Sequence, residues 1–260
     1  MKAYKRISKI IFCLLLSFSF ISNNVMAKDT AYAWYVKRNG NNRPNLQSEQ
    51  TIIYKYDGYF IDKKVTDTDD KKILYLTFDL GYENGNTARI LDTLKEENVP
   101  AAFFILDNII LKNTDLVTRI TEEGHLICNH TKNHKDLSFS KEEEIAKNLS
   151  DLERIYEEKC GRQMSKYFRF PEGKYSEHAL SCIQKLGYKT IFWSFAYDDW
   201  DNNRQPNHKK SLNKILENTH NGAVMLFHPT SKTNADIFPT LISKWKEMGY
   251  SFGTLDELTS

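Results

Sequence analysis

The fold of this chain is decided by the stretch Ile73-Leu74-Tyr75-Leu76-Thr77-Phe78-Asp79-Leu80-Gly81-Tyr82-Glu83-Asn84. A short apolar run of strand-forming residues ends at a carboxylate, Asp79, and a glycine-containing turn and a helical pattern follow it. A carboxylate at the C-terminal end of a buried strand is a common way for an α/β protein to present a catalytic group. A single aspartate in this position is also often a turn residue or a helix cap, so the interpretation depends on the rest of the chain.

Four later segments end in the same manner, with polar residues directly after a predicted strand. They are residues 129–134, 169–173, 198–200 and 226–228. The carboxyl ends of parallel strands meet at one end of a barrel, so the side chains that follow them converge. Five such strand ends in one chain therefore predict a functional site.

Strand and helix patterns alternate from residue 73 to the end of the chain. Strands are predicted at residues 73–79, 101–106, 126–130, 167–171, 190–197, 223–228 and 251–255. Apolar residues at helical spacing predict helices at residues 87–97, 141–158, 177–186, 212–217 and 235–248. Repeated alternation of this kind predicts an α/β fold with a mostly parallel sheet, either open or closed into a barrel.

The 260 residues suit one large α/β domain or two small ones, and the sequence shows no second boundary after Asp70. Residues 71–260 are therefore predicted to form the main domain. Residues 28–70 are polar and rich in turn residues, but their aromatic side chains argue against disorder. We expect them to pack on the main domain as an N-terminal extension.

Residues 1–27 have the pattern of a secretory signal peptide. Four basic residues precede an apolar segment at residues 10–21, and Val25 and Ala27 offer small side chains for cleavage before Lys28. The apolar segment is too short for a comfortable membrane span. Export is therefore predicted, and membrane association is expected only if the signal remains uncleaved.

The charge and aromatic content of the chain bear on its possible ligands. The formal net charge is +2, from 36 basic and 34 acidic residues, and no basic stripe predicts a nucleic-acid partner. The aromatic content of 13% suits a sugar-binding cleft, although core packing explains most of these rings. Without the signal peptide three cysteines remain, which is no disulfide framework. Among them, Cys128 is expected to be a small buried hydrophobe rather than a metal ligand.

The candidate metal ligands are His130 and His134. Their spacing stacks two imidazoles on one face of a helix, and in a tight turn after a strand they converge equally well. Two unrelated histidines are the alternative for so short a motif. The strand before His130, together with the strand ends at Asp79 and His228, favours the metal site.

Four further residues would complete a hydrolytic mechanism around such a metal, which would polarise a carbonyl and lower the pKa of water. Asp79 would be the general base, and His228 the general acid for a departing amine. Arg169 would keep Asp79 ionised and oriented, and Asp199 would fix the tautomer of His228. Taken singly, Arg169 could instead form a surface ion pair and Asp199 could be a turn residue.

The five strand-end motifs form an ordered set. They are Thr77-Phe78-Asp79-Leu80-Gly81, His130-Thr131-Lys132-Asn133-His134, Arg169-Phe170-Pro171-Glu172-Gly173, Ala196-Tyr197-Asp198-Asp199-Trp200 and Leu226-Phe227-His228. The set resembles the NodB-homology polysaccharide deacetylases, carbohydrate esterase family 4. The resemblance implies a distorted (β/α) barrel that removes an acetyl group from an N-acetyl amino sugar with a divalent metal, zinc first and manganese, cobalt or magnesium as alternatives. It implies the roles given above and adds Trp200 as a wall of the sugar cleft.

Further segments carry a narrower likeness that reaches back to the mature N-terminus. They are residues 34–39, 56–60, 82–85, 192–197 and 231–235. They resemble the delta-lactam-biosynthetic de-N-acetylases of spore-forming bacteria, which deacetylate N-acetylmuramic acid in peptidoglycan without stem peptides, a step toward the muramic δ-lactam of spore cortex. This resemblance implies peptidoglycan glycan strands as the partner, the cell envelope or the forespore intermembrane space as the location, and Tyr82 as a substrate-binding residue.

Two residues depart from these family patterns. Leu80 replaces a second aspartate that completes the metal ligands of the wider family, and leucine offers no donor atom. Two histidines would leave an open site, to be completed by water, by Asp79 or by the acetyl oxygen. Glu172 stands where the subgroup is expected to have a basic residue for the lactyl carboxylate, and neighbouring Lys174 is the candidate to replace it.

Three other functions are also compatible with the sequence. The chain could deacetylate N-acetylglucosamine or another glycan, or it could be an O-acetyl esterase. It could also be a cell-wall-binding pseudoenzyme that lost tight metal affinity at Leu80. A binding module has no chemical need for both a base and an acid, so the presence of Asp79 and His228 favours the enzyme.

Overall fold

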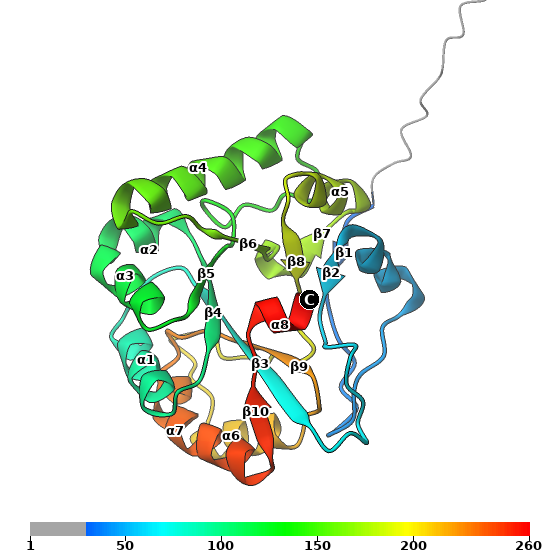
Figure 1. Cartoon of the computed structure of the whole chain (residues 1–260), viewed down its shortest axis with the longest axis vertical. Helices are drawn as coiled ribbons and strands as arrows, with labels where there is room; N and C mark the ends of the chain where they lie inside the picture. The colour runs from blue at the N-terminus through cyan, green and yellow to red at the C-terminus, as the bar shows by residue number, and fades with distance from the viewer. Residues whose placement is uncertain (1–29) are drawn as a thin grey trace, which may run out of the picture.

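A curled parallel sheet ringed by helices forms the body of the molecule (Figure 1). The computed structural model describes residues 30–260, and the predicted signal peptide lies outside them. The strands are β1 (Tyr32–Ala33), β2 (Gly58–Tyr59), β3 (Lys72–Leu80), β4 (Ala101–Ile105), β5 (Leu126–Asn129), β6 (Ser165–Phe168), β7 (Lys174–Tyr175), β8 (Lys189–Ile191), β9 (Ala223–Phe227) and β10 (Tyr250–Phe252). The helices are α1 (Asn86–Glu96), α2 (Asp107–Lys112), α3 (Thr114–Glu122), α4 (Glu142–Cys160), α5 (Glu177–Lys185), α6 (His208–Leu216), α7 (Lys232–Glu247) and α8 (Leu255–Thr259), with 3-10 turns η1 (Ser48–Tyr56) and η2 (Pro171–Gly173).

The sheet confirms the predicted distorted barrel. Its strands run in the order β10-β3-β4-β5-β6-β8-β2, β9 also pairs with β3, and all of these pairs are parallel. The wall between β8 and β9 is incomplete and is bridged by single contacts. Phe195 pairs with Met225, and Ile61 of the N-terminal segment pairs with Ala223.

Period-two alternation along each strand separates the barrel interior from the face that packs on the helices. On β3, Phe78 and Leu80 belong to the helix-facing core, whereas Tyr75 belongs to an interior cluster. That cluster also contains Cys128, which confirms the prediction of a small buried hydrophobe. Burial raises the pKa of the Cys128 thiol. Thr77 and Asp79 follow Tyr75 at alternate positions, so the interior becomes polar toward the strand ends.

Opposite the strand ends, the short helix α8 closes the barrel. Leu255 and Leu258 pack into the interior cluster, and the Tyr167 hydroxyl donates to Asp256 at 2.5 Å. Figure 1 shows α8 in red across the middle of the molecule, inside the ring of the other helices. One end of the barrel is therefore plugged, and only the end that carries the polar residues can admit a ligand.

Residues 30–70 fill the side of the barrel that helices leave uncovered (Figure 1). Strand β2 adds to the sheet beside β8, and β1 pairs with β7. Trp34 stacks on Phe192 with ring centroids 4.3 Å apart, and its backbone amide donates to Gly173 O at 2.8 Å. Gly173 has φ +65, and a Cβ there would lie 2.8 Å from Trp34 Cβ. The close approach of these two segments therefore requires a glycine.

Several predicted elements differ from those observed. Residues 107–122, for which no helix was predicted, form α2 and α3. The buried residues Val117 and Ile120 of α3 have the spacing of a helix face, so the sequence carried a signal for α3 that the prediction missed. The predicted strand at 251–255 ends at Phe252, and α8 begins at Leu255 behind a Thr254 capping box. The predicted strand at 190–197 ends at Ile191, because the chain bends there to reach β9.

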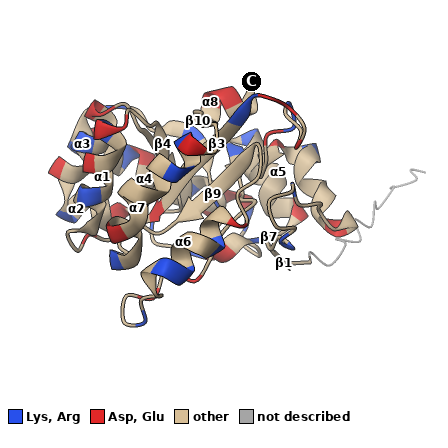
Figure 2. Ribbon diagram, turned by 90° about the horizontal axis from the view of Figure 1, so that it is seen from below, with Lys and Arg blue, Asp and Glu red and all other residues tan. Residues whose placement is uncertain are grey.

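The surface carries both signs of charge. Figure 2 shows acidic and basic residues intermingled along the outer helices rather than separated onto two faces. Among residues 30–260, no helix combines the length and the apolar character that a membrane crossing needs.

Candidate active site

The predicted site residues meet at the open end of the barrel. A cleft of about 710 Å³ is lined by Asp79, His134, Trp200 and His228, together with Glu172 and Arg38. Asp79 lies at the end of β3, four residues come from separate later segments, and Arg38 comes from the N-terminal segment; the parallel strands bring them to one place. Arg169, Asp199 and His130 lie directly beneath this lining, buried against the residues that they support.

A buried arginine holds the Asp79 carboxylate. Arg169 is 0% exposed, and its Nη1 donates to Asp79 Oδ1 at 2.8 Å. Its other donors reach Thr77 Oγ1 at 2.9 Å and the Ile191 carbonyl at 2.9 Å, and the guanidinium lies 4.1 Å from the centre of the Phe104 ring. These hydrogen bonds in different directions fix the orientation of the guanidinium, and through it the orientation of the Asp79 carboxylate.

The charge state of Asp79 results from opposing effects. Burial is the largest and raises the pKa of the carboxyl, but Arg169, His130 and His228 together lower it below its usual value. The pKa of Asp79 is therefore lowered overall. Asp79 is an ionised carboxylate at neutral pH and can accept a proton.

His130 is held as a neutral imidazole. Its Nδ1 lies 2.9 Å from the Arg169 carbonyl oxygen, and because a carbonyl only accepts hydrogen bonds, Nδ1 carries the proton. Nε2 is then unprotonated, and it faces Asp79 Oδ2 at 3.5 Å. Burial lowers the pKa of His130 to about 4. A backbone carbonyl that orients an imidazole in this way is typical of a metal-ligating histidine.

His134 reaches the same point through a strained turn. Thr131 and His134 both have left-handed backbone angles, φ 67 and φ 60. The turn is fixed by Asn129, whose side-chain oxygen accepts from the Thr131 amide at 2.9 Å, and by Thr131 Oγ1, which accepts from Lys135. The rings of His130 and His134 lie 5.1 Å apart, edge to face. The two imidazoles therefore converge in a turn after β5 rather than on a helix.

Leu80, at the position where the resemblance implies a third metal ligand, is an apolar side chain. Leu80 is 0% exposed and packs in the helix-facing core. Among the described residues, no three His, Cys, Asp or Glu side chains are grouped so as to hold a metal ion. His130 Nε2 and His134 fit a divalent metal as two nitrogen donors beside the Asp79 carboxylate, with the remaining positions open to solvent or substrate.

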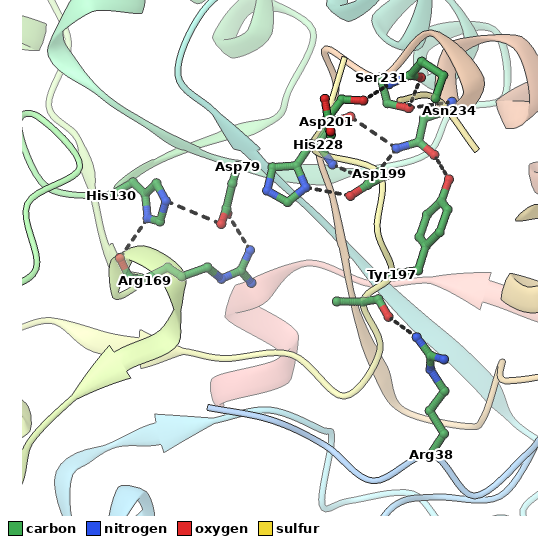
Figure 3. Close-up of polar contacts among 12 residues, drawn as sticks. Arg38, Asp79, His130, Arg169, Tyr197, Asp199, Asp201, His228, Ser231 and Asn234 are labelled. Carbon is green, nitrogen blue, oxygen red and sulfur yellow. Dashed lines mark hydrogen bonds and ion pairs between the residues drawn. The ribbon is translucent and has the colours of Figure 1, made fainter. Parts of the chain in front are cut away.

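A second carboxylate orients His228 from the other side of the cleft (Figure 3). Asp199 is 1% exposed, and its Oδ1 accepts from His228 Nδ1 at 2.7 Å. Its Oδ2 accepts from the His228 backbone amide at 2.9 Å and from Asn234 Nδ2 at 2.6 Å. Tyr197 donates to the Asn234 carbonyl oxygen and fixes the direction of that amide. The other ring nitrogen of His228, Nε2, is available to a ligand in the cleft.

Asp199 also sets the charge of His228. Burial is the largest effect and lowers the pKa of the imidazole, but the charge of Asp199 and its hydrogen bond outweigh burial. Asp79 adds to this effect, and the pKa of His228 is raised. The protonated imidazole is therefore favoured opposite an ionised Asp79, as acid–base catalysis requires.

The three predicted substrate-binding residues lie in different places. Trp200 is 58% exposed and lines the cleft, where a flat ring is open to a ligand. Tyr82 is exposed and contacts the side chain of Asn202, but it is not among the residues that line the cleft. Lys174 is not among the residues that line the cleft, and its Nζ lies 2.7 Å from Glu172 Oε2.

Sequence reasoning missed four residues that support the site. They are Arg38, Thr77, Tyr197 and Asn234. Three of them lie in segments that carry the narrower resemblance, but their roles depend on contacts with distant parts of the chain. Thr77 had a local signal, because it precedes Asp79 by two residues on a strand and so shares its face.

Comparisons with known proteins agree with this geometry. Residues 66–191 match the family model described as polysaccharide deacetylase. The peptidoglycan-N-acetylmuramic acid deacetylase PdaA of Bacillus subtilis is 35% identical over 227 residues, which cover 86% of this chain and 84% of PdaA. The solved structure of PdaA, a family 4 carbohydrate esterase, superimposes with a TM-score of 0.82 at 33% identity and covers 88% of this chain and 96% of that one.

Two other relatives differ in activity from PdaA. A peptidoglycan-N-acetylglucosamine deacetylase of Bacillus cereus is 29% identical over 73% of this chain and 89% of its own length. A pseudoenzyme of the same esterase family from Bacillus anthracis has a solved structure with a TM-score of 0.67 at 27% identity, covering 73% of this chain and 66% of that one.

Proposed function

Because the chain belongs to the polysaccharide deacetylase family, we propose that it hydrolyses the N-acetyl group of N-acetylmuramic acid in peptidoglycan. The products are acetate and a free amine on the sugar. In strands without stem peptides this amine can close on the neighbouring lactyl carboxylate, which would give the muramic δ-lactam of spore cortex. Substrate of this kind implies action in the cell envelope, outside the cytoplasmic membrane.

One observation carries the proposal: the Asp79 carboxylate, held by Arg169, and the His228 imidazole, held by Asp199, line the same cleft. Asp79 is positioned to take a proton from the water that attacks the acetyl carbon. His228 is positioned to protonate the nitrogen as the carbon–nitrogen bond breaks, so that the amine leaves as a neutral group. Arg169 and Asp199 touch neither reacting atom and act by orienting these two groups.

We propose that His130 and His134 hold a divalent metal, with zinc as the expected ion. When bound, the metal would polarise the acetyl carbonyl and lower the pKa of water. The chain contributes the tautomer of His130, which its hydrogen bond to the Arg169 carbonyl sets, and the turn that brings His134 beside it.

The muramic assignment is supported by the likeness to PdaA, which extends over most of both chains. Its main competitor is deacetylation of N-acetylglucosamine, which Glu172 favours because a carboxylate in the cleft lining repels a lactyl carboxylate. A cell-wall-binding pseudoenzyme is favoured by Leu80 alone, and the paired orientation of Asp79 and His228 argues against it.

The test is product analysis by mass spectrometry on three substrates: intact peptidoglycan, peptide-stripped glycan strands and chitin oligomers. Each is incubated with zinc, manganese, cobalt or no added metal. We expect loss of acetyl groups from muramic residues of the stripped strands in the presence of metal. Activity on chitin alone would replace the muramic assignment by the glucosamine one, and no deacetylation under any condition would leave the pseudoenzyme.

A further inference from the structure

The cleft is lined by more negative than positive side chains, and this excess affects which substrate it can bind. Asp79, Glu172 and Asp198 line the cleft with carboxylates. Within the described chain, Arg38 is the only lysine or arginine in this lining. It belongs to the N-terminal segment, and its guanidinium reaches toward the loop that carries Tyr197 and Asp199 (Figure 3).

The position of Arg38 is built into the fold. Four residues before it, Trp34 is fixed by its hydrogen bond to Gly173 O at 2.8 Å, and its indole donates to Trp193 O at 2.9 Å. Arg38 Nη2 donates to Ala196 O at 2.9 Å, and the guanidinium lies 5.7 Å from the centre of the Phe195 ring. A guanidinium held at two points is pre-organised for a ligand.

Most of its hydrogen-bonding capacity remains unused. Arg38 makes this one hydrogen bond and no ion pair within residues 30–260. A guanidinium has five N–H donors, so a fork of two stays available for a carboxylate. An unpaired cation in a cleft otherwise lined by carboxylates attracts an anionic group to one place and leaves the rest of the lining repulsive to it.

Neither of the other nearby cations can perform this role. Arg169 is fully buried, and its guanidinium is bonded to Asp79, Thr77 and backbone carbonyls. Lys174 forms an ion pair with Glu172 at 2.7 Å and does not line the cleft. Both side chains of this pair are exposed, and the Lys174 charge is already engaged with Glu172, so it is not free for a ligand.

We propose that Arg38 binds the lactyl carboxylate of muramic acid and so selects this sugar over its uncharged neighbour. This inference rests on the proposed function and extends it to substrate choice. The lactyl group is attached to the ring carbon next to the one that bears the acetamido group. When the acetamido group lies between Asp79 and His228, the carboxylate therefore lies within the same cleft.

The experiment compares two substrates and four proteins. The substrates are peptide-stripped glycan strands and the same strands with their lactyl carboxylates converted to neutral amides. The proteins are the wild type, Arg38→Gln, Arg38→Lys and the control Arg154→Gln, which alters an exposed arginine on α4 that pairs with Glu158. The readouts are kcat and KM for acetate release from each substrate.

We expect the wild type to prefer the acid over the amide by about tenfold to a hundredfold, the range of a charge-assisted hydrogen bond. Arg38→Gln should lose this preference through a higher KM on the acid alone, and Arg38→Lys should keep part of it. Arg154→Gln should behave as the wild type. A purely structural role of Arg38 at Ala196 would instead lower both rates by the same factor.

The outcomes separate the two proposals. If the wild type deacetylates muramic strands but shows no preference for the acid, or if Arg38→Gln keeps the preference or lowers both rates equally, the role of Arg38 is wrong and the proposed function stands. If the wild type leaves muramic residues acetylated and acts only on N-acetylglucosamine, both proposals fail together.

Discussion

The two halves of the cleft differ in how many of their polar side chains are held in place by hydrogen bonds. The acid half comprises Tyr197, Asp199, His228 and Asn234, and the metal half comprises Leu80, His130 and His134. In the acid half both oxygens of Asp199 accept hydrogen bonds, and His228 is held through its ring and its backbone. In the metal half two imidazoles converge, but the third side chain is turned into the core. The groups proposed to transfer protons are therefore held by the protein alone, whereas the proposed metal would depend on few donors.

The largest expected effect comes from Asp79, which lies between the two halves. Asp79→Asn keeps the shape of the side chain and an oxygen for Arg169, but it removes the group that accepts the proton. We expect kcat/KM on peptide-stripped glycan to fall by about 10³-fold or more. Circular dichroism and thermal unfolding would check that the fold is kept. A rate near that of the wild type would remove Asp79 from the mechanism and leave the metal half to act alone.

Leu80 tests whether the metal half can be completed. Leu80→Asp would place an unpaired carboxylate in the helix-facing core, and Leu80→Ala is the control for the lost packing. We expect the alanine variant to lose about 2 to 5 kcal/mol of unfolding free energy and the aspartate variant to lose more, without gain in metal affinity. Urea unfolding and calorimetric metal titration would measure both. An aspartate variant as stable as the control, with tighter metal binding, would show that this side chain can turn into the cleft.

The acid half is tested through its pH dependence. In the wild type Asp199 raises the pKa of His228, so the protonated acid persists to higher pH than for a free histidine. In Asp199→Asn burial acts without this charge and lowers the pKa, so activity should disappear at lower pH on the alkaline side. We expect kcat to fall by about 10²-fold as well. The pH profile of kcat/KM is the readout, and an alkaline limb that does not move would mean that His228 is not the acid.

The grouping of the proposed catalytic side chains could be predicted from the sequence because each lies at or just after the end of a strand. Parallel strands place their C-terminal ends together whatever the connecting helices are, so Asp79, His130 and His228 needed only the alternating pattern to be assigned to one site. Their supporting contacts needed the fold. Asn234 approaches Asp199 from the start of α7, 35 residues away in the chain, and no local pattern records such a contact.

The N-terminal segment also makes long-range contacts that the sequence pattern does not reveal. Its aromatic residues indicated that residues 28–70 pack on the main domain, but not which face they would cover. The glycine at position 173 is a local sign of close approach, yet its partner, Trp34, is 139 residues earlier. The place of Arg38 in the cleft follows from this contact together with the hydrogen bonds of Trp34 to Trp193 O and of Arg38 to Ala196 O. Long-range packing therefore accounts for the part of the site that periodicity could not reveal.

The smallest expected effect is that of metal removal on stability. The metal half offers two imidazoles, and when the metal leaves, Arg169 still compensates the charge of Asp79. Binding at ten times the dissociation constant stabilises a protein by only about 1.4 kcal/mol. For a chain of this size chelation should therefore lower Tm by about 4 °C or less, while acetate release is lost and returns with added zinc. Differential scanning calorimetry with and without chelator measures the shift. A fall of more than about 10 °C would mean that the metal holds the strand ends together, and that the metal half is as integral to the fold as the acid half.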